Sequence, residues 1–157
     1  MSSEEIKGQN SRLLLMSHIK TAYTMANLKI LIVEDECIVA RDIQSILKRL
    51  GYGESFVAFT GKEAIEKAIE IQPELVMMDI KLKKDMDGIE AGEKIRSFLD
   101  IPIIYISASA DGKTLERAKK TEPFYFISKP IKVSAIQTTI KKACLKHNME
   151  NKSSMCK

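Results

Sequence analysis

Polar residues that could handle a phosphoryl group and a metal ion stand at the ends of four apolar runs. Carboxylates are oxygen ligands of the kind that Mg²⁺ prefers, and a carboxylate can attack phosphorus to form an aspartyl phosphate. A hydroxyl and an ammonium group can offset the charge that develops on the transferred group. These residues are Glu34 and Asp35 after LKILIV, Asp79 closing ELVMMD, Ser107 closing IPIIYIS, and Lys129, followed by Pro130, after FYFIS.

The apolar runs are predicted to be buried strands of one parallel β-sheet. A fifth run, SFVAF, lies between the first and the third, and stretches with helical periodicity separate all five. Helical crossovers join parallel strands, so the carboxyl ends of the strands lie at one edge of the sheet. Open α/β sheets bind their ligands at that edge. Three carboxylates, a hydroxyl and an ammonium group would therefore converge there, on a (βα)5 unit.

Local signals mark the starts of three of the five predicted helices. Thr60 and Glu63 form a capping box for the second helix. Asp111 can cap the fourth helix, and Ser134 with Gln137 can open the fifth. Each signal follows a predicted strand closely, so the alternation of strands and helices is regular.

Composition indicates an ordinary globular domain. The chain has 157 residues, of which 45% are hydrophobic and 29% are charged. We expect one domain over residues 28–148, preceded by an extension of uncertain order (1–27) and followed by a flexible tail (149–157). The longest apolar runs fall far short of the roughly 20 residues that a transmembrane helix needs. No membrane association is therefore predicted.

Cysteine spacing and charge exclude several classes of protein. Cys37, Cys144 and Cys156 are an odd, widely spaced set without a CxxC pair, which argues against a disulfide framework or a zinc site. The amino terminus lacks the features of a secretory signal, so we expect reduced thiols and a cytoplasmic location. The net charge of +4 comes from interspersed Lys and Arg, so direct binding to nucleic acid is not expected.

In this order, the strand-end residues resemble the receiver domain of two-component response regulators, over roughly residues 28–148. That family has an acidic pair after the first strand, an Asp after the third, Thr or Ser with a small neighbour after the fourth, and Lys-Pro after the fifth. The segments MDGIEAGEKIR and IPIIYISA are also typical of the family. The resemblance implies a flavodoxin-like three-layer α/β sandwich, with its parallel strands in the order 2-1-3-4-5.

The resemblance also implies a role for each site residue. Asp79 would accept the phosphoryl group, and Lys129, joined to Pro130 by a cis peptide bond, would bind an outer phosphoryl oxygen. Ser107 would bind another oxygen and draw its loop inward, and Phe126 would swing into the space that the hydroxyl leaves. Mg²⁺ would be the cofactor, held by the carboxylates of Asp35 and Asp79, by that of Glu34 directly or through water, and by the main-chain carbonyl of Lys81.

A stand-alone phosphoacceptor is the leading functional interpretation. A sensor histidine kinase or a histidine phosphotransfer protein would supply the phosphoryl group. Since the chain ends soon after the fifth helix, we expect a downstream partner protein to read the surface of the fourth helix, fifth strand and fifth helix. The same face could support a phosphorylation-linked dimer. Slow loss of the phosphoryl group would be the only catalysis, so a metabolic enzyme is not expected.

The alternative is a Mg²⁺-dependent phosphohydrolase with an Asp nucleophile. Such enzymes usually carry a second acid two residues after the nucleophile, where this chain has Lys81. A nucleotide-binding module is disfavoured, because the sequence has neither GxGxxG nor a GKS/T phosphate loop.

Overall fold

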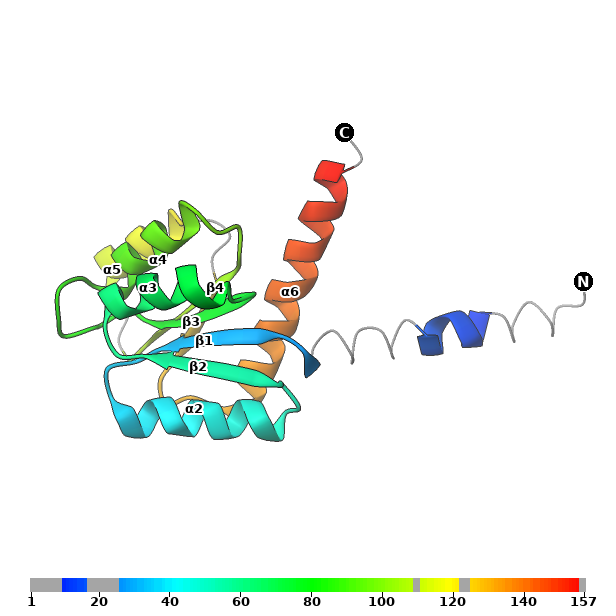
Figure 1. Cartoon of the computed structure of the whole chain (residues 1–157), viewed down its shortest axis with the longest axis horizontal. Helices are drawn as coiled ribbons and strands as arrows, with labels where there is room; N and C mark the ends of the chain where they lie inside the picture. Colours follow the sequence, from blue (N-terminus) through cyan, green and yellow to red (C-terminus); the bar gives the residue numbers. More distant parts are fainter. Residues whose placement is uncertain (1–9, 17–25, 109–110, 122–124, 156–157) are drawn as a thin grey trace, which may run out of the picture.

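A five-stranded parallel sheet forms the centre of the computed structural model, which describes residues 10–16, 26–108, 111–121 and 125–155 (Figure 1). The strands lie in the order β2-β1-β3-β4-β5, and all four pairings are parallel. Both features confirm the fold predicted from the sequence. The strands are β1 (Lys29–Val33), β2 (Glu54–Ala58), β3 (Leu75–Asp79), β4 (Ile103–Ser107) and β5 (Tyr125–Ser128).

Helices cover both faces of the sheet and make three layers. One apolar cluster joins α2 and α6 to one face, and a second joins α3, α4 and α5 to the other. In Figure 1, α2 lies on the side of the sheet opposite α3, α4 and α5. The helices are α2 (Cys37–Arg49), α3 (Gly61–Ile71), α4 (Gly88–Arg96), α5 (Gly112–Lys119) and α6 (Val133–Met155). The fourth and fifth helices of the sequence prediction are thus α5 and α6.

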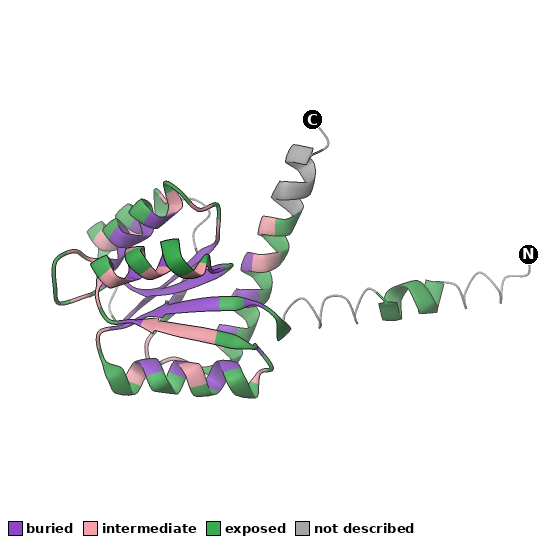
Figure 2. Cartoon of the chain, in the orientation of Figure 1, coloured by how far each residue is buried: buried purple, intermediate pink, exposed green. Residues whose placement is uncertain are grey.

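The central strands are continuous apolar runs because both of their faces are covered. Every residue of β3 and β4 is buried, and Figure 2 shows these strands in purple over their whole length. Alternate residues contribute to the two clusters: Met77 packs toward α2 and α6, whereas Met78 packs toward α3, α4 and α5. Asp79 is the first charged residue after this run, so the strand delivers a carboxylate to the edge of the core.

Capping signals were predicted correctly for two helices and wrongly for one. Thr60 accepts a hydrogen bond from the Glu63 amide at 3.0 Å, and Asp111 accepts one from the Thr114 amide at 2.7 Å. The proposed capping box at Ser134 is wrong, because α6 already begins at Val133. Ser134 therefore lies inside the first turn rather than at the N-cap.

The two ends of the chain add helical segments to the domain. Helix α6 continues to Met155, beyond the boundary near residue 148 that the sequence predicted. Residues 145–155 contain neither Gly nor Pro and include strong helix formers such as Leu145 and Glu150, so nothing local ends the helix. Of the predicted extension, residues 10–16 are helical with Leu13 to Met16 exposed; residues 1–9 and 17–25, like 156–157 at the other end, lie outside the described part.

Within the described part of the chain, no helix has both the length and the apolar character needed to cross a membrane.

Candidate functional site

Three carboxylates meet at the carboxyl edge of the sheet. Glu34 and Asp35 follow β1, and Asp79 ends β3; oxygens of the three side chains lie within 4.8 Å of one another. Glu34 and Asp79 are only 1% and 4% exposed, whereas Asp35 is partly exposed. Adjacent parallel pairing of β1 and β3 brings these residues together although about 45 positions separate them in sequence.

Lys129 supplies the positive charge beside two of these carboxylates. Its ammonium nitrogen lies 3.0 Å from Glu34 Oε2 and 3.1 Å from Asp79 Oδ2. The Lys129 amide donates to the carbonyl of Ser107 at 2.9 Å, which ties the ends of β4 and β5 together. The Lys129–Pro130 peptide bond is cis, as the resemblance to receiver domains implied. The side chain therefore reaches the site from a strand two places away from β3.

Backbone amides orient the carboxylates. The Lys81 amide donates to Asp79 Oδ1 at 3.0 Å, and the Lys83 amide donates to Asp35 Oδ2 at 3.2 Å. The Glu36 amide donates to Glu34 Oε1 at 3.1 Å. Since charged acceptors make the stronger hydrogen bonds, each carboxylate is held by the backbone that follows a strand. The contribution of Lys83 was missed by sequence reasoning, because no motif marks an amide.

Gly88 allows the backbone to close tightly under Asp79. The Gly88 amide donates to the carbonyl of Ile80 at 2.8 Å, which closes the loop between β3 and α4. A Cβ atom at this position would lie 2.0 Å from the carbonyl oxygen of Asp79. No side chain fits there, so glycine is required by the close approach. Gly88 is the first of two glycines in the segment MDGIEAGEKIR, and the sequence alone did not indicate this close approach.

Burial and mutual repulsion set the electrostatics of the site. Burial, together with the charge of Asp79, raises the pKa of Glu34 to about 7, although the Glu36 amide and Lys129 act in the opposite direction. Burial alone would lower the pKa of Lys129, but its bonds to Glu34 and Asp79 raise this pKa overall. The ammonium group therefore stays charged. A hard divalent cation fits such a set of oxygen ligands.

The two predicted switch residues lie on neighbouring strands. Ser107 ends β4 and is 1% exposed, one position beyond the residue that pairs with Asp79. Phe126 of β5 is half-buried, pairs with Tyr105 and packs on the cluster beneath α3, α4 and α5. The switch roles of Ser107 and Phe126, and that of the Lys81 carbonyl as a metal ligand, stay predictions.

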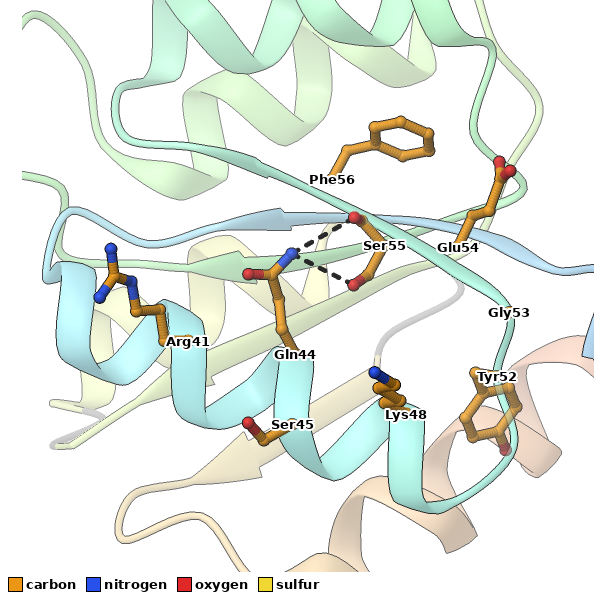
Figure 3. A pocket seen from close by; sticks show the side chains of 9 residues that line it. All are labelled: Arg41, Gln44, Ser45, Lys48, Tyr52, Gly53, Glu54, Ser55 and Phe56. Atoms are coloured by element: carbon orange, nitrogen blue, oxygen red, sulfur yellow. Dashed lines mark hydrogen bonds between the residues drawn. The ribbon is translucent and has the colours of Figure 1, made fainter.

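A hollow between α2 and the edge strand β2 is separate from this site (Figure 3). The side-chain amide of Gln44 crosses it and donates to the carbonyl and hydroxyl oxygens of Ser55, both at 3.3 Å. None of the carboxylates described above lines it, nor does Lys129. Its lining residues are Arg41, Gln44, Ser45, Lys48, Tyr52, Gly53, Glu54, Ser55 and Phe56.

Comparison with protein families decides the class of the protein. Residues 30–141 match the model of the response regulator receiver domain. The chain belongs to this family. The acidic pair, Asp79, Ser107 and Lys129 all lie within the matched range.

Known relatives agree with this assignment. The transcriptional regulatory protein PdtaR of Mycobacterium tuberculosis is 33% identical over 115 residues, which are 73% of this chain and 56% of PdtaR. The phyllosphere-induced regulator PhyR of Methylorubrum extorquens is 30% identical over 116 residues, 73% of this chain and 43% of PhyR. The receiver domain thus spans about half the length of these curated relatives.

Solved structures show the same architecture. The receiver domain of a modulated diguanylate cyclase from Desulfovibrio desulfuricans G20 has a TM-score of 0.74 and 32% identity, with 79% of this chain and 98% of that chain covered. The PhyR receiver domain of Erythrobacter litoralis has a TM-score of 0.68 and 32% identity, with 78% and 93% covered. A likeness of this extent supports both the fold and the family.

Proposed function

We propose that Asp79 accepts a phosphoryl group from a phosphohistidine in a Mg²⁺-dependent reaction and that a partner protein reads the result. The donor would be a sensor histidine kinase or a histidine phosphotransfer protein. The observation that carries this proposal is the position of the Asp79 carboxylate, 3.1 Å from the Lys129 ammonium and within 4.8 Å of the carboxylates of Glu34 and Asp35. A buried acid of a receiver domain, with cation and metal ligands beside it, is suited to phosphoryl transfer.

The carboxylates fit Mg²⁺ by number and by chemistry. Glu34, Asp35 and Asp79 would hold the ion, and the carbonyl of Lys81 would be a further ligand. When bound, Mg²⁺ neutralises carboxylate charge and helps to orient the phosphoryl oxygens. Burial and the charge of Asp79 raise the pKa of Glu34 because both disfavour its charged form. A bound cation would stabilise that charged form.

Three side chains of the protein would carry out the phosphoryl transfer itself. One oxygen of Asp79 attacks phosphorus in line, a new O–P bond forms, and the P–N bond to the donor imidazole breaks with its electron pair going to the imidazole nitrogen. The Lys129 ammonium binds an outer phosphoryl oxygen and offsets the charge there. The Ser107 hydroxyl donates to another oxygen. The buried position of Asp79 limits the access of water to the product.

The signal would pass to the surface formed by α5, β5 and α6. When Ser107 binds the phosphoryl group, its loop moves inward and Phe126 takes up the space, which changes that surface. Phe126 lies in β5, which is part of this face, and Ser107 ends β4, which pairs with β5. The face is therefore well placed to report on Asp79. A relative from Bartonella quintana, with a TM-score of 0.70 and 26% identity over 93% of this chain and 59% of that chain, is titled anti-anti-sigma factor PhyR. We propose that this receiver domain likewise acts on a protein, in the cytoplasm.

Acetyl phosphate offers a direct test that needs no cognate kinase. In the presence of Mg²⁺, intact mass measurement should show one added phosphoryl group on the parent protein and none on Asp79→Asn. Asp42→Asn, which changes an exposed acid of α2, is the matched control and should gain the group normally. An unmodified parent protein would contradict the proposal. Repeated release of phosphate from small phosphoesters would favour the phosphohydrolase alternative.

A further inference from the structure

The loop between β3 and α4 carries the amides that orient two of the three carboxylates. Lys81 donates to Asp79 and Lys83 to Asp35, at 3.0 and 3.2 Å. The base of the loop is closed by the bond from Gly88 to the carbonyl of Ile80. The position of the Lys83 amide therefore depends on what holds the tip of this loop, residues 82–86.

Asp85 attaches the tip of the loop to the start of α3. Its Oδ2 atom accepts a hydrogen bond from the Lys62 amide at 3.1 Å. Lys62 is the second residue of α3, so this carboxylate satisfies one of the amide groups that a helix leaves unpaired at its N-terminus. The bond joins two segments that are 23 positions apart and places the loop across the end of the helix.

Two further observations show that the tip is held in a specific place. Asp85 has a φ of +29°, a region that residues other than glycine rarely occupy and keep only when surrounding contacts fix them. Met86 packs where Gly61, the first residue of α3, has no side chain: a Cβ on Gly61 would lie 2.4 Å from Met86 Cγ. The backbone conformation of Asp85, its hydrogen bond with the Lys62 amide and the packing of Met86 beside Gly61 all fix the tip in the same position.

We infer that Asp85 is a positioning residue of the carboxylate site proposed to bind Mg²⁺. By fixing the loop two residues after Lys83, it holds the Lys83 amide on the carboxylate of Asp35 and so keeps that carboxylate turned toward Asp79 and Glu34. Asp85 would act through the backbone of this loop, since its own carboxylate bonds to the Lys62 amide. The inference rests on the proposed function in one respect, because it takes Asp35 to be a ligand of Mg²⁺.

Three variants separate this role from simple support of the helix. Asp85→Gly accommodates the positive φ but removes the acceptor. Asp85→Asn tolerates the same backbone and keeps an acceptor oxygen. Thr60→Ala removes the other cap of α3, the bond from the Glu63 amide at 3.0 Å, and leaves Asp85 and the loop unchanged.

Mg²⁺ affinity and amide exchange are the two measurements. Mg²⁺ titration followed by NMR should show about tenfold weaker binding for Asp85→Gly, the lower end of the range for groups that orient metal ligands. In the metal-free protein, the Lys83 amide of this variant should exchange faster than in the parent. Asp85→Asn should bind within about twofold of the parent, since its acceptor remains. Thr60→Ala should melt earlier with unchanged Mg²⁺ affinity.

Several outcomes would overturn the inference. Parent-like Mg²⁺ affinity in Asp85→Gly would do so, as would equal losses in Asp85→Gly and Thr60→Ala, which would reduce Asp85 to a helix cap. A parent protein that binds Mg²⁺ but takes no phosphoryl group from acetyl phosphate would refute the proposed function and leave the role of Asp85 standing. A parent protein without measurable Mg²⁺ binding would refute both.

Discussion

Replacing Gly88 by alanine should destabilise the domain and disturb Asp79 together. The added Cβ would lie 2.0 Å from the Asp79 carbonyl oxygen, 2.8 Å from its carbonyl carbon and 2.9 Å from the Ile80 Cα. All three are backbone atoms, so the strand end or the start of α4 must move. Overpacking of this kind costs about 1–3 kcal/mol. The φ of Gly88 is not positive, so the clash alone decides the effect.

Gly112 provides a matched control for this substitution. Like Gly88, it is the first residue of a helix and follows an aspartate N-cap. A Cβ there would meet nothing within 4 Å, so Gly112→Ala should stabilise the protein by about 0.4–1 kcal/mol through the unfolded state.

Urea denaturation measures the difference between the two variants. With a slope of about 1–3 kcal/mol per molar urea, the midpoint of Gly88→Ala should lie below that of Gly112→Ala by about 1 M. Phosphoryl uptake from acetyl phosphate should also slow in Gly88→Ala alone, since the atoms that must move carry Asp79. Equal midpoints for the two variants would refute the packing argument.

Three other changes probe the metal, the switch and the charge of the site. Asp35→Asn should weaken Mg²⁺ binding measured by calorimetric titration while the protein stays folded, because the loss of a charge also relieves repulsion; undiminished affinity would exclude Asp35 as a principal ligand. Ser107→Ala should still be phosphorylated but should lose the hydrogen-exchange changes that beryllofluoride and Mg²⁺ induce over residues 111–121 and 125–142, and equal changes in both proteins would exclude Ser107 as the switch. Without metal, the free energy of unfolding should fall as pH rises from about 4.5 to 7, because the raised pKa of Glu34 means that the native state binds its proton more tightly than the unfolded state. The urea midpoint should fall with rising pH in the parent and should depend less on pH in Glu34→Gln. An equal pH dependence in the two proteins would assign the effect to another group.

The residues that end strands could be placed from the sequence, because parallel topology alone sends the ends of β1, β3, β4 and β5 to one edge. The continuous apolar runs identified these strands, and turn and cap residues separated them. Asp79, Glu34 and Lys129 therefore converge as the order of strands requires. Their separation in sequence was no obstacle, since the argument needed only strand order and direction.

The loop after Asp79 could not be predicted in the same way. The bonds of Lys83 and the clash at Gly88 depend on backbone conformation rather than on residue type. Asp85 resembled an ordinary polar loop residue, and its partner Lys62 acts through its amide, which every residue except proline has. The end of α6 was also misplaced, because polar residues without a break are compatible with either a helix or a tail.

Locating the phosphoryl group tests the central claim most directly. After incubation with acetyl phosphate and Mg²⁺, borohydride reduces an aspartyl phosphate to homoserine, which tandem mass spectrometry of the peptides can assign to one position. We expect homoserine at position 79 and unmodified aspartate or glutamate at positions 34, 35 and 85. Homoserine at another position, or none in a protein that still gains the mass of a phosphoryl group, would contradict the assignment of Asp79 as the phosphoacceptor.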